Sequence, residues 1–583
     1  MKTITLIFLF IASFVNVLSN TRDPRVREYI TPKRIVWVSN EQNIKNSQVL
    51  LLDGKGQSDL LDNNVCNMIS KDGECASVLL DFGKEIQGGI QIVTGQSKGP
   101  VNVRIRFGES VGEAMSELGN KRSSNAHAIR DFKTVLPNLG VAELGNSGFR
   151  FVRIDLLGNN VDFHLKEVRA ISVFRDIPYK GTFRCSDKRL DEIWKTGAYT
   201  VHLNMQEYLW DGIKRDRLVW VGDMHPEVMT INTVFGYNEV VPKSLDMIRD
   251  LTKLPSWMNR ICSYSIWWLI IQRDWYLYHG DIEYLQKQKD YILSLLDLLI
   301  DNVGEDGIEK LKGGRFLDWP SNKHPKAINA GLQSLMIMAM NAGYELCMIF
   351  NEKEKAEKCK TLSDKMLESS DPVKQEYLNS GKRITDPGHK QGAALMSLAG
   401  IMDPAEADRN IISVEGAKGF STFYGYYMLK AMAKAGNYQG AVDIIREYWG
   451  GMLDLGATTF WEDFNLDWIE NSSRIDEIVP EGKNDIHGDF GDYCYKGYRH
   501  SLCHGWASGP TSWLSEYVLG IKVLEPGCKV VKIEPHLCDL DWAKGTFPTP
   551  YGIISVKHTK ANDGTVKTEI SAPDEIKVII DLE

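Results

Sequence analysis

The sequence predicts a multidomain, mainly α protein in which a large helical domain lies between two strand-rich regions. The chain has 583 residues, more than a single hydrophobic core usually organises. Short segments with period-two alternation occur near both ends, and long apolar stretches with helical periodicity fill the middle. We expect domains at residues 20–180, 181–520 and 521–583, preceded by a leader at residues 1–19.

The leader is predicted from the first twenty residues. Lys2 precedes an apolar run from Ile4 to Val17, and small and polar residues follow at Ser19 and Asn20. This order is typical of a secretory signal peptide, and the run is shorter than the roughly 20 apolar residues that span a bilayer. No later segment of the sequence is typical of a membrane span. We therefore expect an exported protein, periplasmic or secreted, without membrane insertion after cleavage.

The N-terminal domain is predicted to be a β-sandwich. Polar and apolar residues alternate from Val101 to Phe107 and from Phe151 to Leu156, and Gly and Asn separate such runs. Alternation over short segments with turn residues between them favours antiparallel strands.

The helical domain is predicted to begin after Asp187, whose side chain is a plausible helix N-cap. Several of the helical stretches are apolar over most of their surface, which predicts an inner and an outer layer of helices. The clearest stretches are Tyr291–Ile300, Ala327–Phe350, Gln391–Met402 and Phe420–Tyr448. Strand-like patterns return after Pro526, at Gly552–Lys557 and Lys577–Ile580.

The composition is that of a globular protein. Hydrophobic residues make up 43% and charged residues 25% of the chain, and the formal net charge is −9. No Lys/Arg-rich run is present, so nucleic acid is not an expected partner. Among the ten cysteines, Cys66 with Cys75 and Cys528 with Cys538 are close enough in sequence to be considered as disulfides of an exported chain.

The densest polar segment runs from Tyr208 to Glu227. Trp and apolar residues alternate with its charges, which favours a cleft over a solvated surface. Arg215 and Arg217 flank Asp216 and can hold several carboxylates together with separated pKa values, as acid–base chemistry requires. A second cluster, Gly456–Phe464, contains Glu462 between aromatic residues. Burying such an acid costs free energy unless it has a partner or a task.

Aromatic residues accompany further polar positions, at Phe316–Pro320 and at Tyr264–Trp268. Indole rings stack on the C–H faces of sugars, whereas most of the fifteen Trp are expected to fill the helical core. Asp318, Trp319, Trp461 and Arg215 are expected to contribute to a sugar site.

Metal and nucleophile chemistry are poorly supported. His500 and His504 have the i, i+4 spacing of a zinc-binding helix, but the Glu that follows the first His in metalloproteases is absent. Cys503 is next to His504 in sequence, without a family signature around the pair. We expect no metal and no cofactor.

These residues resemble those of the inverting α-L-rhamnosidases of glycoside hydrolase family 78. The matching segments are Leu80–Glu85, Arg106–Ser110, Gly181–Asp187, Asp211–Asp223, Gly456–Glu462 and Ser501–Trp506. Together with the final strands they cover most of the chain. The resemblance implies an (α/α)6 barrel catalytic domain flanked by N-terminal and C-terminal β-sandwich domains. It also implies exo-acting, inverting release of terminal α-L-rhamnose from a glycan or glycoside substrate.

Carried over by position, the resemblance makes Asp216 the general acid and Glu462 the general base. Asp211 and Asp223 fall on substrate-binding acids, Trp220 and Trp319 on subsite aromatics, and His504 on a sugar-contacting histidine. The family block reads Arg-Asp-Glu-Arg, whereas this chain has Arg215-Asp216-Arg217, one residue shorter and with Asp as the acid. Glu227 and Glu207 remain the alternative acids, and Asp463 is the alternative base.

Two other functions remain open at this point. The same barrel can serve an exoglycosidase for another deoxy-sugar or for a uronic acid, because a fold does not determine which hydroxyls its pocket recognises. A carbohydrate-binding protein without catalysis is the alternative outside the enzymes, and the presence of Glu462, Asp211 and Asp223 argues against it.

Overall fold

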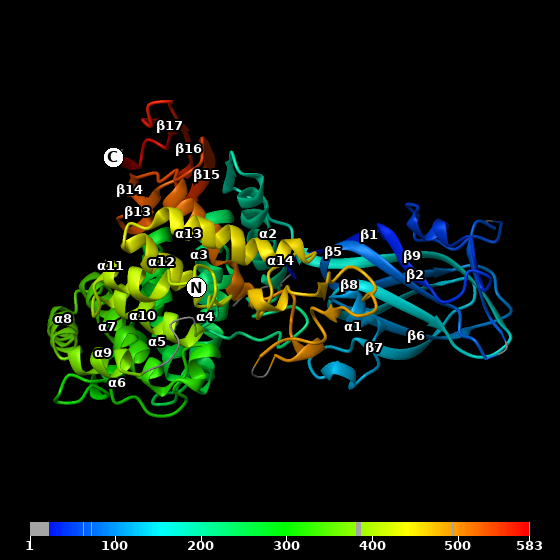
Figure 1. The fold of residues 1–583 in the computed structure, drawn as a ribbon, viewed down its shortest axis with the longest axis horizontal. Coiled ribbons are helices and arrows are strands. Elements are labelled where there is room, and N and C mark those ends of the chain that lie inside the picture. Colours follow the sequence, from blue (N-terminus) through cyan, green and yellow to red (C-terminus); the bar gives the residue numbers. More distant parts are fainter. Residues whose placement is uncertain (1–22, 62, 72, 381–385, 493–494, 582–583) are drawn as a thin grey trace, which may run out of the picture.

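The computed structural model describes residues 23–581 apart from residues 62, 72, 381–385 and 493–494. The predicted signal peptide lies outside these residues. The described chain mixes helix and sheet, with sheet domains at both ends of a helical region. Figure 1 shows the N-terminal sheet domain to the right of the helices and the C-terminal strands above them.

The N-terminal sheet domain contains nine antiparallel strands in the order β3-β4-β9-β5-β8-β6-β7, with β1 paired to β9 and β2 to β5. β5 and β8 are long and buried over most of their length at the centre of the sheet. Their apolar side chains form a core that is separate from that of the helical region. The strands are β1 Arg25–Ile30, β2 Arg34–Val38, β3 Ile44–Lys45, β4 Cys66–Ser70, β5 Ser77–Thr94, β6 Val101–Gly108, β7 Asp131–Leu136, β8 Val141–Leu156 and β9 Val161–Arg175.

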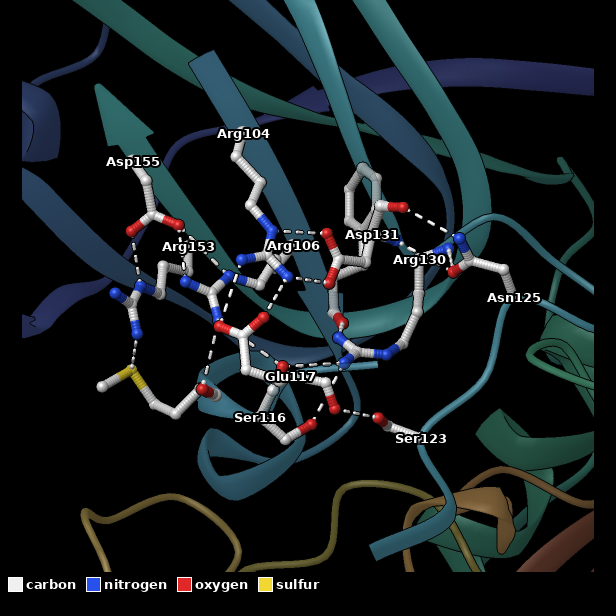
Figure 2. Close-up of polar contacts among 12 residues, drawn as sticks. Arg104, Arg106, Ser116, Glu117, Ser123, Asn125, Arg130, Asp131, Arg153 and Asp155 are labelled. Atoms are coloured by element: carbon white, nitrogen blue, oxygen red, sulfur yellow. Dashed lines mark hydrogen bonds and ion pairs between the residues drawn. The ribbon is translucent and has the colours of Figure 1, made fainter. Parts of the chain in front are cut away.

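Helix α1, Val111–Met115, and the loop after it are fastened to this sheet by arginines. Figure 2 shows the side chains of Arg104 and Arg106 reaching the acids around the loop. Arg104 binds Asp131 and Glu117, each at 2.6 Å, and Arg106 binds Asp155 at 2.6 Å. The two pairs of Arg104 fix the loop after α1 to strand β6.

Arg130 adds a buried anchor to the same segment. Its Nη2 donates hydrogen bonds of 3.0 Å to the carbonyl and to the hydroxyl of Ser116. The Asn125 side chain accepts from the Arg130 amide and donates to the Asp131 carbonyl. The loop between Ser116 and Arg130 is therefore held at both ends (Figure 2).

The helical region begins where the sequence predicts. The Asp187 side chain accepts a hydrogen bond from the Arg189 amide and caps α2. The stretch Phe420–Tyr448 is not one helix: α12 ends before Gly436, which has φ 80°, and Asn437 caps α13. The helices are α2 Lys188–Asn204, α3 Met224–Val234, α4 Val240–Leu251, α5 Cys262–His279, α6 Ile282–Asp301, α7 Pro325–Ile349, α8 Lys353–Glu368, α9 Asp371–Leu378, α10 Pro387–Ala399, α11 Pro404–Ala407, α12 Gly425–Lys434, α13 Tyr438–Ile444, α14 Gly450–Asp454 and α15 Gly509–Trp513.

The C-terminal strands form two small sheets. One has the order β10-β15-β16-β17 and the other the order β13-β14-β18. Strand β10 precedes α2 in sequence but pairs with β15, so the first residues after the N-terminal domain belong to a C-terminal sheet. The strands are β10 Thr182–Cys185, β13 Ile521–Val523, β14 Val530–Ile533, β15 Trp542–Thr549, β16 Gly552–Lys560, β17 Val566–Ser571 and β18 Lys577–Ile580, and β11 Ser472–Ser473 pairs with β12 Asn484–Asp485 elsewhere.

The two cysteine pairs considered from the sequence do not form disulfides. Cys66 is buried in β4, and its thiol is free, as are those of Cys75, Cys528 and Cys538. Burial raises the pKa of Cys66 to about 12, so this thiol is unreactive at neutral pH. Within the described residues, no helix combines the length and the apolar character needed to cross a membrane.

Candidate active site

Two loops of the helical region form the centre of the candidate site. The first joins α2 to α3 through residues 205–223, and the second follows α14 through residues 455–508. An antiparallel bridge connects Gly212 to His504, and the Gly505 amide donates to the Asp211 carbonyl at 2.9 Å. The two polar clusters found in the sequence therefore lie against one another.

Asp211 holds its own loop together. Its Oδ2 accepts from the Asp216 amide and its Oδ1 from the Leu218 amide, both at 2.9 Å. Burial, followed by the charge of Asp216, raises the pKa of Asp211 to about 7. Because both of its oxygens accept hydrogen bonds from backbone amides of the loop, Asp211 determines where Asp216 and its neighbours lie.

Both carboxyl oxygens of Glu462 accept a hydrogen bond. Its Oε1 accepts from Nη2 of Arg215 at 3.0 Å, and its Oε2 accepts from the Ser501 amide at 2.9 Å. Its side chain is 2% exposed. Burial raises the pKa of Glu462, and the Arg215 guanidinium opposes this shift. The charge of Arg215 therefore favours the ionised carboxylate in a buried position.

Asp216 lies closer to solvent, with a side chain that is 20% exposed. Its Oδ2 accepts from the Trp220 indole at 3.2 Å, and its Oδ1 lies 3.3 Å from Nε2 of His127. Nη1 of Arg215 is 3.9 Å from the same Oδ1. One guanidinium thus contacts both Asp216 and Glu462.

Asp223 and Glu227 lie at the start of α3. The Tyr264 hydroxyl donates to Asp223 at 2.7 Å, and burial raises the pKa of Asp223 well above its ordinary value. Glu227 is 0% exposed, and within the described residues neither of its oxygens has a hydrogen-bond partner. Burial, with Asp223 and Asp211 nearby, raises its pKa well above the ordinary value, which favours a neutral carboxylic acid.

Asp318 and Trp319 follow a short loop before α7. Gln391 donates to Asp318 at 2.6 Å and Ser421 at 3.1 Å, and burial raises the pKa of Asp318 to about 6. The Trp319 ring is partly exposed and packs edge-on against Tyr495, with ring centroids 5.4 Å apart.

His504 and Trp461 complete the predicted set. Nε2 of His504 lies 3.6 Å from Glu462 and 3.7 Å from Asp211, so it links the two loops. Burial and the charge of Arg215 lower its pKa well below the ordinary value, which keeps the imidazole neutral. The Trp461 ring is buried, and its indole N–H has no hydrogen-bond partner among the described residues.

The residues of the site differ in burial, and we name the buried set the floor and the partly exposed set the rim. The floor consists of the carboxyls of Asp211, Asp223, Asp318 and Glu462, all buried. The rim consists of Asp216, Trp220 and Trp319, which remain partly accessible. Acids that face partly exposed indoles form a surface suited to a polyhydroxylated, partly apolar ligand such as a sugar ring.

The alternative residues take other positions. Glu207 is 43% exposed and forms an ion pair with Lys243 of α4, away from the buried floor. Asp463 accepts a hydrogen bond from the Asp492 amide at 3.0 Å, and burial raises its pKa to about 7. Its own amide donates to Nε2 of His500 at 3.0 Å, so that nitrogen of His500 is already occupied.

A second buried cluster lies beside the site, at its contact with the N-terminal sheet domain. Within the described part of the chain, Glu109, Glu113 and His487 form the one group of three with ligand atoms close enough to hold a metal. Nζ of Lys214 lies 2.9 Å from Glu109 and 3.3 Å from Glu113. The chain itself thus supplies the cation that balances these acids.

The sequence did not indicate several residues of the site. Gln391 and Tyr495 contact predicted residues from distant elements, and Tyr264, which the sequence indicated only as one of the aromatic residues near polar positions, binds Asp223. His127 reaches Asp216 from the N-terminal domain, and nothing in its neighbourhood in the sequence indicates this. Lys214 lies within the dense polar segment, where its position beside Arg215 was the available signal.

Residues 178–518 match the family described as the bacterial α-L-rhamnosidase six-hairpin glycosidase domain. Residues 520–583 match the bacterial α-L-rhamnosidase C-terminal domain. Among curated proteins, the α-L-rhamnosidase of Alteromonas sp. (strain LOR) is 25% identical over 554 residues, which cover 86% of this chain and 56% of that protein. The α-L-rhamnosidase of Formosa agariphila is 22% identical over 70% of this chain and 44% of its own length. The chain spans about half the length of these relatives.

Solved structures agree on the fold. The family 78 rhamnosidase of Bacillus sp. GL1 superposes with a TM-score of 0.74 at 22% identity, over 92% of this chain and 55% of that one. A rhamnosidase from Klebsiella oxytoca, solved with rhamnose bound, gives a TM-score of 0.64 at 17% identity, over 85% of this chain and 96% of its own. Because the six-hairpin match alone covers more than half of the sequence, the chain belongs to the bacterial α-L-rhamnosidases of glycoside hydrolase family 78.

Proposed function

We propose that the chain is an exo-acting α-L-rhamnosidase that releases terminal α-L-rhamnose from a glycan or glycoside with inversion at the anomeric carbon. Glu462 is the general base and Asp216 the general acid. The observation that carries this proposal is the contact of one guanidinium, that of Arg215, with both carboxyls.

The contacts of Arg215 are compatible with an inverting reaction. A guanidinium that lies 3.0 Å from one carboxyl and 3.9 Å from the other sets an upper limit on their separation, and this limit permits the roughly 6.5–9.5 Å that leaves room for a water molecule. Glu462 takes a proton from this water, which attacks the anomeric carbon. Asp216 gives its proton to the glycosidic oxygen as the bond to the aglycone breaks.

The environments of the two carboxyls fit these roles. Glu462 is buried and accepts two hydrogen bonds, one of them from a cation, as an ionised base requires. Asp216 lies at the rim beside the Trp220 indole, where the leaving group of a terminal sugar enters solvent. An acid in this position can be reprotonated from solvent after each turnover.

The remaining residues are proposed to bind the sugar. Asp223 and Asp318 of the floor, together with the buried His504, can bind hydroxyl groups of the sugar. Trp220, Trp319 and Trp461 supply apolar faces. Arg215 and Asp211 bind sugar while they hold the two catalytic carboxyls in place.

The family descriptions and the bound rhamnose of the Klebsiella structure support the sugar and the architecture. We propose that the helices form an (α/α)6 barrel and that both sheet domains are β-sandwiches. We also propose export, based on the Lys2-led apolar run. Mass spectrometry of the protein from its native host then finds a mature N-terminus near Asn20, whereas soluble protein that retains Met1 contradicts export.

The activity is tested with three aryl glycosides: p-nitrophenyl α-L-rhamnoside, α-L-fucoside and β-D-glucuronide. The rhamnoside is expected to be cleaved at least about a hundredfold more efficiently than the other two, because a site that pairs with specific hydroxyls rejects sugars that lack them. Glu462→Gln protein serves as the inactive control. Equal cleavage of the three substrates, or preference for another, overturns the assignment.

A further inference from the structure

The contact between the N-terminal sheet domain and the candidate site contains a repeated pattern. Arg215 binds Glu462, and its neighbour Lys214 binds Glu109 at 2.9 Å. The Ser501 amide donates to Glu462, and the next amide, that of Leu502, donates to Glu109 at 2.6 Å. Two pairs of consecutive residues thus each connect one carboxyl of the helical region to one of the N-terminal domain.

Glu109 is placed for this by the end of β6 and the start of α1. It is 0% exposed, and its amide donates to the Glu113 side chain at 2.9 Å. The contacts of Arg104 and Arg106 with Glu117, and of Arg130 with Ser116, fix the end of α1 and the following loop to the sheet (Figure 2). Glu109 is therefore a rigidly mounted carboxyl group at the domain boundary.

Lys214 is held from several directions. Its Nζ donates to the carbonyls of Tyr498 at 2.9 Å and His500 at 2.6 Å, besides its ion pairs with Glu109 and Glu113. A buried cation with this many partners has little freedom to move. Since Lys214 and Arg215 are consecutive, fixing the first restrains the backbone that carries the second.

We propose that Glu109 and Lys214 are a positioning pair through which the N-terminal sheet domain holds Glu462 in its reactive place. The inference rests on the proposed function, in which Glu462 is the general base. Both groups that bind Glu462, the Arg215 guanidinium and the Ser501 amide, are adjacent in sequence to a group that binds Glu109. If the contact between Glu109 and Lys214 is lost, the Arg215 guanidinium and the Ser501 amide both lose their restraint.

The pair also acts on the charge of Glu462. Lys214 lowers the pKa of Glu462 against the effect of burial, in the same direction as Arg215. The other titratable groups that influence or contact Glu462 are Asp211, Asp216, Asp223, Asp463 and His504. None of these is altered when Lys214 is replaced by Met.

The test compares Glu109→Gln and Lys214→Met with the wild type and with Asp81→Asn. Asp81 is a matched control, because it is also a buried acid of the N-terminal sheet that pairs with an interdomain arginine, Arg150. kcat and KM on an aryl rhamnoside are measured from pH 4 to 9, together with thermal unfolding of each variant.

Glu109→Gln is expected to lower kcat about tenfold to a hundredfold with little change in KM, since a displacement of the order of 1 Å at a reacting group costs that much. Lys214→Met is expected in addition to move the acidic limb of the pH profile to higher pH. The sign follows because the base works only when ionised, and removal of a nearby positive charge raises its pKa. Asp81→Asn is expected to lower stability and leave the acidic limb unchanged.

The pair is merely structural if Glu109→Gln and Lys214→Met lose no more kcat than Asp81→Asn and keep the wild-type acidic limb. If Lys214→Met does not fold, the nearly isosteric Glu109→Gln variant tests the proposal alone. A lower kcat with little change in KM supports the positioning role. A wild-type protein without rhamnosidase activity overturns the proposed function itself. An active wild type whose Glu109→Gln variant has unchanged kcat and KM overturns only the positioning role.

Discussion

Nε2 of His127, from the N-terminal sheet domain, lies 3.3 Å from Oδ1 of Asp216 in the helical region. The proposed acid is therefore held between a histidine of one domain and the Trp220 indole of the other. The two oxygens of Asp216 thus face different domains, and Oδ2 accepts a hydrogen bond from the Trp220 indole.

Asp216→Asn is expected to slow cleavage of a natural rhamnoside by about a hundredfold to ten-thousandfold, because its alcohol leaving group needs a proton. An aryl rhamnoside with an acidic phenol does not need this proton and is expected to retain most of its rate. Steady-state kinetics on both substrates check the difference. Glu207→Gln is the matched control, since Glu207 is exposed and paired with Lys243, and it is expected to keep wild-type rates. Equal losses on both substrates would make Asp216 a positioning residue.

Glu462→Gln is expected to abolish turnover of both substrates alike, by about a hundredfold or more, because the attacking water must lose a proton in either case. Binding of rhamnose, measured by calorimetry, is expected to survive because Asp211, Asp223 and Asp318 remain. Asp463→Asn serves as the comparison. If Glu462→Gln keeps more than about a tenth of wild-type turnover while Asp463→Asn is inactive, the base is Asp463.

The first product of hydrolysis is expected to be β-L-rhamnose. Proton NMR during the first turnovers resolves the two anomers before mutarotation mixes them. The prediction follows from the proposed roles, in which Glu462 activates a water molecule and does not itself attack the anomeric carbon. An initial α product would assign a covalent intermediate to the site instead.

Glu227→Gln is expected to stabilise the protein at pH 8 and to have less effect as the pH falls. The folded-state pKa of Glu227 is raised, so the wild type loses stability as the pH rises through it, whereas Gln does not titrate. The substitution breaks no hydrogen bond among the described residues. Thermal unfolding from pH 5 to 8 checks the trend, and a wild type that is the more stable at pH 8 refutes it. Retained activity of this variant also excludes Glu227 as the acid.

Local patterns predicted much of the fold. The run Lys577–Ile580 is strand β18 with the same bounds, and Asp187 caps α2 as expected. Apolar periodicity continued across Gly436 and Asn437, however, and concealed the turn between α12 and α13. Periodicity reports which face of a helix is buried, and two successive helices with buried faces maintain it through a short break.

The site was predictable where its residues are close in sequence. Asp211, Arg215, Asp216 and Trp220 lie within one loop, where the dense polar segment and the family resemblance indicated them. The partners that orient the other carboxyls of the site come from distant elements: Ser501 binds Glu462, Tyr264 binds Asp223 and Gln391 binds Asp318. Such pairings depend on how distant elements pack, which a single sequence does not encode in any local pattern.

The pairing of β10 with β15 determines where the protein can be truncated without loss of its core. The apolar side chains of Phe183 and Cys185 pack in the same core as the helices and the C-terminal strands, through Ala543 and Phe547. A truncated chain that stopped at residue 520 would leave Thr182–Cys185 without its neighbouring strand and would expose part of that core to water. The shortest part of the chain expected to fold with the helical region intact therefore includes the C-terminal strands. A tag or fusion partner is better placed after these strands than in place of them.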